Sequence, residues 1–184
     1  MLTHAQFDFD GVCLLERQVF RTPFEPTKAA GEAVTFLHMV NGAGMLHTPS
    51  GPQPMAPSDS AILTRGGDCR VEWSRNADRA PHAVLLVHFH PEVLLAAYRG
   101  MVPEMFRLAP AFESVPINRI PLDRHVANYI ESLEFYFRQS ALMSDELMLL
   151  KMKELLCLLV HSEQASKVKA VIGDCFNRAT QPKS

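Results

Sequence analysis

The residues of this chain whose types and spacing come closest to metal chemistry are histidines on strand-like segments. His88 and His90 flank Phe89, and alternate residues of a strand face the same side, so this pair could chelate one ion. His38 and His47 lie on two consecutive strand-like runs and could approach each other across strands. A zinc or iron site built from His38, His47 and His88 is the resulting candidate. The alternative for each residue, which we favour, is a partly buried and hydrogen-bonded histidine, so we expect no metal and no cofactor.

Other patterns that carry chemistry are missing from the sequence. It contains no GxSxG motif, no glycine-rich phosphate loop and no pair of carboxylates at a meaningful spacing. The run Gly42-Ala43-Gly44 indicates a turn rather than a phosphate-binding loop. We therefore expect no catalytic residues and no enzymatic activity.

Short strands separated by turns must position these histidines. Val34–Val40 is a β-rich run that stops at the turn dipeptide Asn41-Gly42, and Gly44–Thr48 makes the return strand of a predicted hairpin. In Cys69–Ser74 apolar and polar residues alternate as in a half-buried strand, and Ala83–Phe89 has the composition of a buried strand. Many short strands with Gly and Pro turns predict a barrel or sandwich.

The interior of this barrel is the candidate ligand pocket. Alternation along the strands leads us to assign to it Phe36, His38, Met45, His47, Val71 and Trp73. Apolar walls with a few polar groups suit a small organic effector. The alternative is that the same residues fill a closed core.

The periodicity changes from strand to helix after Pro91. Val93–Met101 suits a short helix, and Arg107–Pro121 is a proline-punctuated connector. Asp123 can cap a helix over Arg124–Gln139. A last helix carries Val168, Val171, Ile172, Cys175 and Phe176 at helical spacing.

Between these two helices lies the leucine-rich segment Ser144–Ser162, which Ser144 can cap. From Leu147 to Val160 its only charged residues are two lysines and one glutamate. A helix on a single core needs only one apolar stripe, so this helix has enough apolar surface to contact its own core and another chain. The alternative is a helix buried within one domain. The candidate dimer interface consists of Leu147, Leu150, Leu155, Leu158 and Leu159, with Lys151 and Glu154 at its edge; the pattern does not decide which face meets the partner.

Composition bounds the class of protein. With 18 basic and 20 acidic residues among 184, a net charge of −2 and no basic run, this chain lacks the positive surface that nucleic-acid binding requires. The four cysteines form no CxxC pair, and we expect them to be reduced, as in a cytoplasmic protein. The N-terminus has no signal-peptide pattern, and no apolar run reaches the roughly 20 residues that span a bilayer. We expect a cytoplasmic protein without membrane contact.

Two stretches together resemble a known family. Residues 34–73, with Pro57, Asp59 and Gly66 in matching places, are similar to a small cupin barrel. The stretch Leu86–Leu94 (LVHFHPEVL), followed by SLEFYF and the leucine-rich helix, resembles the N-terminal half of AraC-type transcription regulators, in the branch that includes activators of type III secretion genes.

The resemblance implies an α+β fold, with a cupin-like β-barrel or jelly roll over residues 1–91, a helical dimerisation region over residues 92–178 packed as one domain with the barrel, and a linker or tail over residues 179–184. It implies a homodimeric domain that senses a small-molecule effector or a regulatory protein. It also implies DNA binding through a C-terminal helix-turn-helix domain, which we expect to be absent from this chain.

The metal motif of catalytic cupins is broken. Met45-Leu46-His47 and Asp68-Cys69-Arg70 stand where that motif places its metal ligands. The alternatives are a small metal-dependent cupin enzyme, of the isomerase or dioxygenase type, and a stand-alone domain that modulates a full-length regulator.

Overall fold

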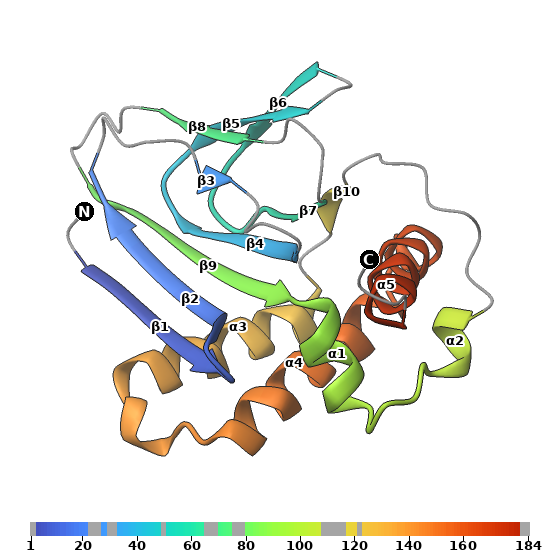
Figure 1. Cartoon of the computed structure of the whole chain (residues 1–184). Coiled ribbons are helices and arrows are strands. Elements are labelled where there is room, and N and C mark those ends of the chain that lie inside the picture. Colours follow the sequence, from blue (N-terminus) through green and yellow to red (C-terminus); the bar gives the residue numbers. More distant parts are fainter. Residues whose placement is uncertain are drawn as a thin grey trace.

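Two antiparallel sheets and a layer of helices make up the structure, which is a computed structural model (Figure 1). It describes residues 3–21, 27–28, 33–48, 51–64, 70–74, 80–107, 117–120 and 123–180. The four-stranded sheet lies against one face of the six-stranded sheet, and helices lie along the other face. The predicted α+β class is confirmed, as is the order of a cupin-like β half followed by helices.

The elements have the following bounds. The larger sheet has the strand order β1 (Thr3–Phe9), β2 (Val12–Phe20), β9 (His82–Phe89), β4 (Val34–Asn41), β7 (Ser60–Leu63) and β10 (Ile117–Ile120). The smaller sheet has the order β3 (Thr27–Lys28), β8 (Arg70–Trp73), β5 (Gly44–Thr48) and β6 (Gly51–Met55). The helices are α1 (Pro91–Ala97), α2 (Glu104–Arg107), α3 (Arg124–Arg138), the 3-10 helix η1 (Ser140–Leu142), α4 (Asp145–Leu159) and α5 (Ala165–Thr180).

Both faces of the larger sheet are buried, and each face has its own hydrophobic cluster. On β9, Val84 and Leu86 belong to the cluster between the two sheets, whereas Leu85 and Val87 belong to the cluster beneath the helices. Every residue of β9 is buried. A strand covered on both faces is apolar without alternation, which is the pattern that β4 and β9 share.

The predicted hairpin of Val34–Val40 with Gly44–Thr48 is wrong. β4 pairs with β7 and β9 in the larger sheet, and β5 pairs with β6 and β8 in the smaller one. The chain crosses from one sheet to the other at Gly42, whose φ of +101° suits glycine. A Cβ atom at Gly42 would also overlap the ring of His82. The turn dipeptide was therefore correctly read as a turn, but it joins two sheets instead of two paired strands.

The two helices with predicted caps begin where the sequence predicts, whereas α1 begins at Pro91 and not at the predicted Val93. Asp123 caps α3 by accepting hydrogen bonds from the backbone N–H groups of His125 and Val126, each at 2.8 Å. Ser144 caps α4 by accepting from the N–H of Leu147 at 3.3 Å. Both caps satisfy donors that have no partner inside the helix. None of the helices in the described part of the chain is long and apolar enough to cross a bilayer.

A strand within the helical half was not anticipated. Ile117–Ile120, within the predicted connector, forms β10 on the edge of the larger sheet and pairs with β7. Through β10 the chain returns to the larger sheet after α2, so this sheet contains strands from both the β half and the helical half of the chain. Gly66, Asp68 and Cys69, which the cupin comparison used, and tail residues 181–184 lie outside the described residues.

Candidate functional site

The interior between the two sheets is a closed apolar cluster in the described part of the chain. Two of the predicted pocket residues, Val71 and Trp73, lie in it and are 0% and 8% exposed. Trp73 packs edge-to-face on Phe20 with ring centroids 4.9 Å apart, and His82 stacks on Phe20 at 5.4 Å. The remaining members, all buried, are Leu37, Met39, Leu46, Met55, Ala61, Leu63, Val84 and Leu86.

The other four predicted pocket residues lie elsewhere. Phe36 belongs to the cluster beneath the helices, and His38 follows it on the same face of β4. Met45 and His47 flank Leu46, which points between the sheets, so both lie on the outer face of the smaller sheet. The interior assignment of these four is corrected. Its cause is that both faces of β4 are buried, so the sequence carries no signal for which face meets the second sheet.

The three histidines considered as weak metal candidates, His38, His47 and His88, do not converge. His38 Nδ1 is 2.8 Å from Ser60 Oγ, and His47 Nε2 is 2.9 Å from Glu72 Oε2. His88 contacts a different carboxylate, that of Glu16, at 3.2 Å. Burial lowers the pKa of His38 from 6.5 to about 4, although the negative charges of Glu134 and Asp59 oppose this. Each histidine is thus hydrogen-bonded separately.

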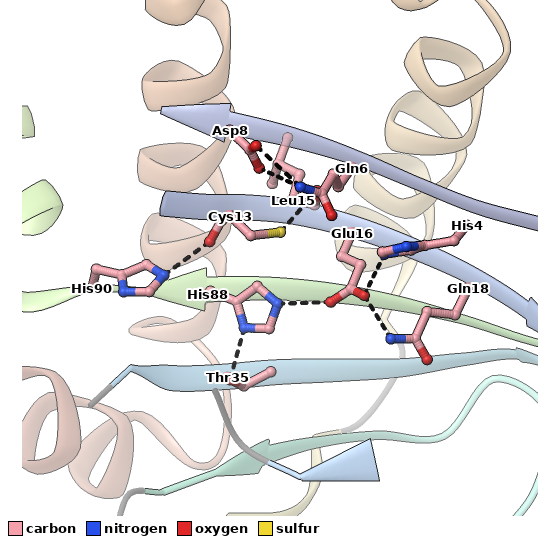
Figure 2. Close-up of polar contacts among 10 residues, drawn as sticks. All are labelled: His4, Gln6, Asp8, Cys13, Leu15, Glu16, Gln18, Thr35, His88 and His90. Atoms are coloured by element: carbon pink, nitrogen blue, oxygen red, sulfur yellow. Dashed lines mark hydrogen bonds and ion pairs between the residues drawn. The ribbon is translucent and has the colours of Figure 1, made fainter. Parts of the chain in front are cut away.

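A polar cluster on the larger sheet, formed by His4, Cys13, Glu16, Gln18, Thr35 and His88, is drawn in Figure 2 and is called the Glu16 cluster below. Glu16 lies between three partners: His88 Nε2 is 3.2 Å from Oε2, His4 Nε2 is 2.7 Å from Oε1, and Gln18 Nε2 donates to Oε1 at 2.6 Å. Four strands contribute to the cluster: β1, β2, β4 and β9.

The cluster occupies the sheet face that looks toward the smaller sheet. Thr35 alternates with Val34 and Phe36 on β4, and both of these point beneath the helices. Thr35 pairs with His88 across the strands, and its Oγ1 is 3.0 Å from His88 Nδ1. His88 is 3% exposed. His88 and His90, the pair that could have chelated one ion, have separate partners: His90 Nε2 donates to the backbone carbonyl of Cys13 at 2.9 Å.

Electrostatics within the cluster stabilise a carboxylate and a neutral thiol. Burial raises the pKa of Glu16, but hydrogen bonds from His88 and Gln18 and the charges of His88 and His4 outweigh it, and the pKa falls from 4.5 to about 2. Burial, followed by the charges of Glu16 and Asp8, raises the pKa of Cys13 from 9.0 to about 12. Glu16 is therefore a carboxylate and Cys13 a neutral thiol at neutral pH.

Among these residues, only His88 was a candidate from the sequence. Cys13 and Glu16 are three residues apart, and on a regular strand this spacing would place their side chains on opposite faces. A bulge on β2, where Leu14 is the extra residue opposite the step from Phe7 to Asp8 on β1, shifts the register and brings the Cys13 and Glu16 side chains together. Bulges leave no clear mark in the sequence, so this cluster could not have been found there.

The second candidate site is α4, which buries one side in the chain's own core. Leu155 and Leu159 are both 0% exposed there, beside Met148, Met152 and Leu156. These two leucines, and Lys151 at 8% exposure, were predicted for a dimer seam and must be removed from it because they are covered within the chain. The prediction could not separate the faces because the helix is apolar nearly all round.

Lys151 is held within the chain by several contacts. Its Nζ donates to Ser132 Oγ at 2.8 Å and to Glu154 Oε2 at 2.7 Å, and it lies 5.6 Å from the centroid of the Tyr129 ring. These contacts join α4 to α3. The opposite side of α4 carries Leu150, 59% exposed, with half-buried Leu147 and Leu158 and exposed Glu154 and Cys157.

The comparisons with known proteins agree with this architecture. Residues 35–171 match the family model of the ExsA N-terminal regulatory domain. No curated protein matches the chain.

Among solved structures, ToxT from Vibrio cholerae bound to an unsaturated fatty acid is similar, with a TM-score of 0.54 and 11% identity over 80% of this chain and 54% of that one. ToxT bound to (E)-4-(8-methylnaphthalen-1-yl)but-3-enoic acid gives 0.53 and 11% over 80% and 57%. At such identity these matches show the fold alone, and the chain spans little more than half the length of ToxT.

A sugar phosphate isomerase of the cupin superfamily from Silicibacter pomeroyi is 21% identical over 41% of this chain and 49% of that chain. Its TM-score of 0.34 is too low to support an argument. The family match covers most of the chain and confirms the resemblance noted in the sequence. This chain belongs to the ExsA N-terminal regulatory domain family, in the type III secretion activator branch of AraC-type regulators.

Proposed function

We propose that this regulatory domain forms a homodimer through the exposed side of α4 and thereby pairs two DNA-binding modules of the full regulator. The observation that carries the proposal is the exposure of Leu150 on a helix whose opposite side is fully buried in its own core. An isologous dimer places the same strip of both copies face to face. Paired modules match two half-sites on DNA, so control of dimerisation controls occupancy.

The charge on this side of α4 supports burial against a second copy. Its acidic residue Glu154 is already paired with Lys151 of the same chain at 2.7 Å. Covering that pair with another helix therefore leaves no charge without a partner, which is the costly case for a buried ion. Leu147, Leu150 and Leu158 then supply apolar surface for the contact.

We propose that a regulatory protein binds this domain and controls it; a small-molecule effector is the other candidate. The cluster between the sheets is packed with large side chains, and Phe20, Met39 and Val71 are each 0% exposed. Close packing of this kind leaves little room for an organic ligand. Either input acts only if it binds one state of the domain better than the other.

We propose a cytoplasmic, non-enzymatic role. The alternative is a metal-dependent cupin enzyme, whose motif would place His47 among the metal ligands. His38 and His47 instead lie on different outer faces of the two sheets, which counts against that alternative.

A reporter experiment tests the proposal. The chain is fused to a DNA-binding module that represses a reporter gene only as a dimer, and the wild-type fusion is expected to repress. Leu150→Lys should relieve repression, whereas Met101→Lys, at a residue 62% exposed after α1, should not. Equal fusion levels are checked by immunoblot. Repression by Leu150→Lys at the wild-type level, or none by the wild type, would contradict the proposal.

A further inference from the structure

The Glu16 cluster brings together three types of metal ligand that nothing in the proposed regulatory role uses. The Sγ of Cys13, a carboxylate oxygen of Glu16 and a ring nitrogen of His88 all lie within 4.8 Å of one another, the one such group in the part of the chain described. A second imidazole lies next to this group, because His4 Nε2 is 2.7 Å from Glu16 Oε1. We propose that Cys13, Glu16 and His88, with His4 as the fourth ligand, form a binding site for Zn²⁺ or a similar thiophilic divalent cation.

The distances fit such an ion. In a tetrahedral zinc site with bonds of roughly 2.1 Å, neighbouring ligand atoms are about 3.4 Å apart. Glu16 Oε2 is 3.2 Å from His88 Nε2 and Glu16 Oε1 is 2.7 Å from His4 Nε2, so both distances are shorter than that value. Small side-chain movements therefore replace two hydrogen bonds by bonds to one ion.

The mixture of ligands selects the class of ion. A thiolate and imidazoles favour zinc and the later transition metals, whereas calcium and magnesium favour all-oxygen sites. Four protein ligands close the coordination sphere, which is typical of a structural zinc site and not of a catalytic one. The chemistry proposed is therefore cross-linking of strands, with no reaction at the metal.

The surroundings orient the ligands. Thr35 Oγ1 lies 3.0 Å from His88 Nδ1 and can accept a hydrogen bond from its N–H, which leaves the Nε2 lone pair free for an ion. Gln18 holds Glu16 in place at 2.6 Å, and its own Oε1 is buried without a hydrogen-bond partner among the described residues. Thr35 and Gln18 are positioning residues in this proposal.

Access and charge also suit a cation. The His4 side chain is 37% exposed, and Cys13 is partly exposed, so an ion can enter from the edge of the sheet. On binding, the Cys13 thiol loses its proton to solvent and the thiolate bonds to the metal, with no change in oxidation state. The site would tie the edge strand β1, through His4, to β2 and the central strand β9.

The test uses the purified, tag-free chain, washed with chelator, kept reduced with a phosphine and titrated with Co²⁺. We expect one equivalent to bind, with a sulfur-to-cobalt charge-transfer band and the visible bands of a tetrahedral ion. Cys13→Ser should abolish the charge-transfer band, while Cys157→Ser, at an exposed cysteine of α4, should keep it. His88→Gln and Glu16→Gln should each weaken affinity by about tenfold or more. His47→Gln, at a matched histidine–glutamate pair on the other sheet, should not.

Two further measurements keep the outcome clear. Thr35→Val should weaken binding while the charge-transfer band remains, and Thr35→Ser should restore affinity. If the ligand variants do not fold, Zn²⁺ on the wild-type chain should protect Cys13, and not Cys157, from alkylation as mapped by mass spectrometry. No charge-transfer band, a band insensitive to Cys13→Ser, or equal alkylation of Cys13 with and without Zn²⁺ would overturn the proposal and leave the cluster as an ion-pair network.

Discussion

Replacing His38 by glutamine should make the free energy of unfolding of this domain less dependent on pH below about pH 6.5. His38 is 3% exposed on β4, bonded to Ser60, and burial lowers its pKa from 6.5 to about 4. Glu134 on α3 and Asp59 before β7 are the charged groups that oppose this shift. Between these two pH values the unfolded chain binds a proton at His38 that the folded chain does not, so stability falls as the pH falls.

The magnitude follows from the two pKa values. The histidine's contribution is fully present above about pH 6.5 and is lost as the pH falls toward about 4. The complete loss corresponds to about 3 kcal/mol, of which about 2 kcal/mol is lost by about pH 5. His82, buried with its pKa also lowered, adds a loss of the same sign, so the difference between wild type and variant is the quantity to measure.

Urea unfolding at a series of pH values from about 8 to about 4.5 gives that difference. His38→Gln keeps an acceptor for the Ser60 hydroxyl and does not titrate, so its free energy of unfolding should fall less than that of the wild type by about 2 kcal/mol at about pH 5. An NMR titration of the His38 ring in the wild type provides a direct check. Parallel curves for the two proteins would refute the argument that burial keeps this ring neutral.

Two substitution pairs test the packing. Gly42→Ala should lower the free energy of unfolding by more than Gly51→Ala, because both glycines have positive φ (+101° and +110°) but only a Cβ at Gly42 meets the His82 ring. In thermal unfolding we expect the two variants to differ by about 1–3 kcal/mol. Equal losses would show that His82 moves aside. Leu155→Ala should lower the free energy of unfolding, measured in urea, by about 2–5 kcal/mol, whereas Leu150→Ala should change it by less than about 0.5 kcal/mol. Similar losses for the two variants would mean that Leu150 is also a core residue.

The sequence predicted elements better than faces. Asp123 and Ser144 mark helix starts because their side chains satisfy local backbone donors, and local chemistry of this kind is visible in a short segment. The faces of β4 were not predictable, because Val34–Met39 is buried throughout between the helices and the second sheet. The same reason explains Leu155 and Leu159, which lie on a helix that is apolar on both sides.

The candidate sites depend on contacts that are distant in sequence. Glu16 meets His88 across 72 positions, and Thr35 meets His88 across 53. These contacts follow from the strand order β1-β2-β9-β4, which short-range patterns do not determine. Family resemblance supplied the class of domain, while the position of the Glu16 cluster required the structure.

Sedimentation equilibrium of the purified chain tests the central claim, that this regulatory domain pairs through the exposed side of α4. We expect a molar mass of twice the 20.6 kDa of one chain for the wild type and for Met101→Lys. For Leu150→Lys we expect a folded species of 20.6 kDa whose helical circular dichroism is unchanged. A monomeric wild type, or a Leu150→Lys variant that stays dimeric, would contradict it.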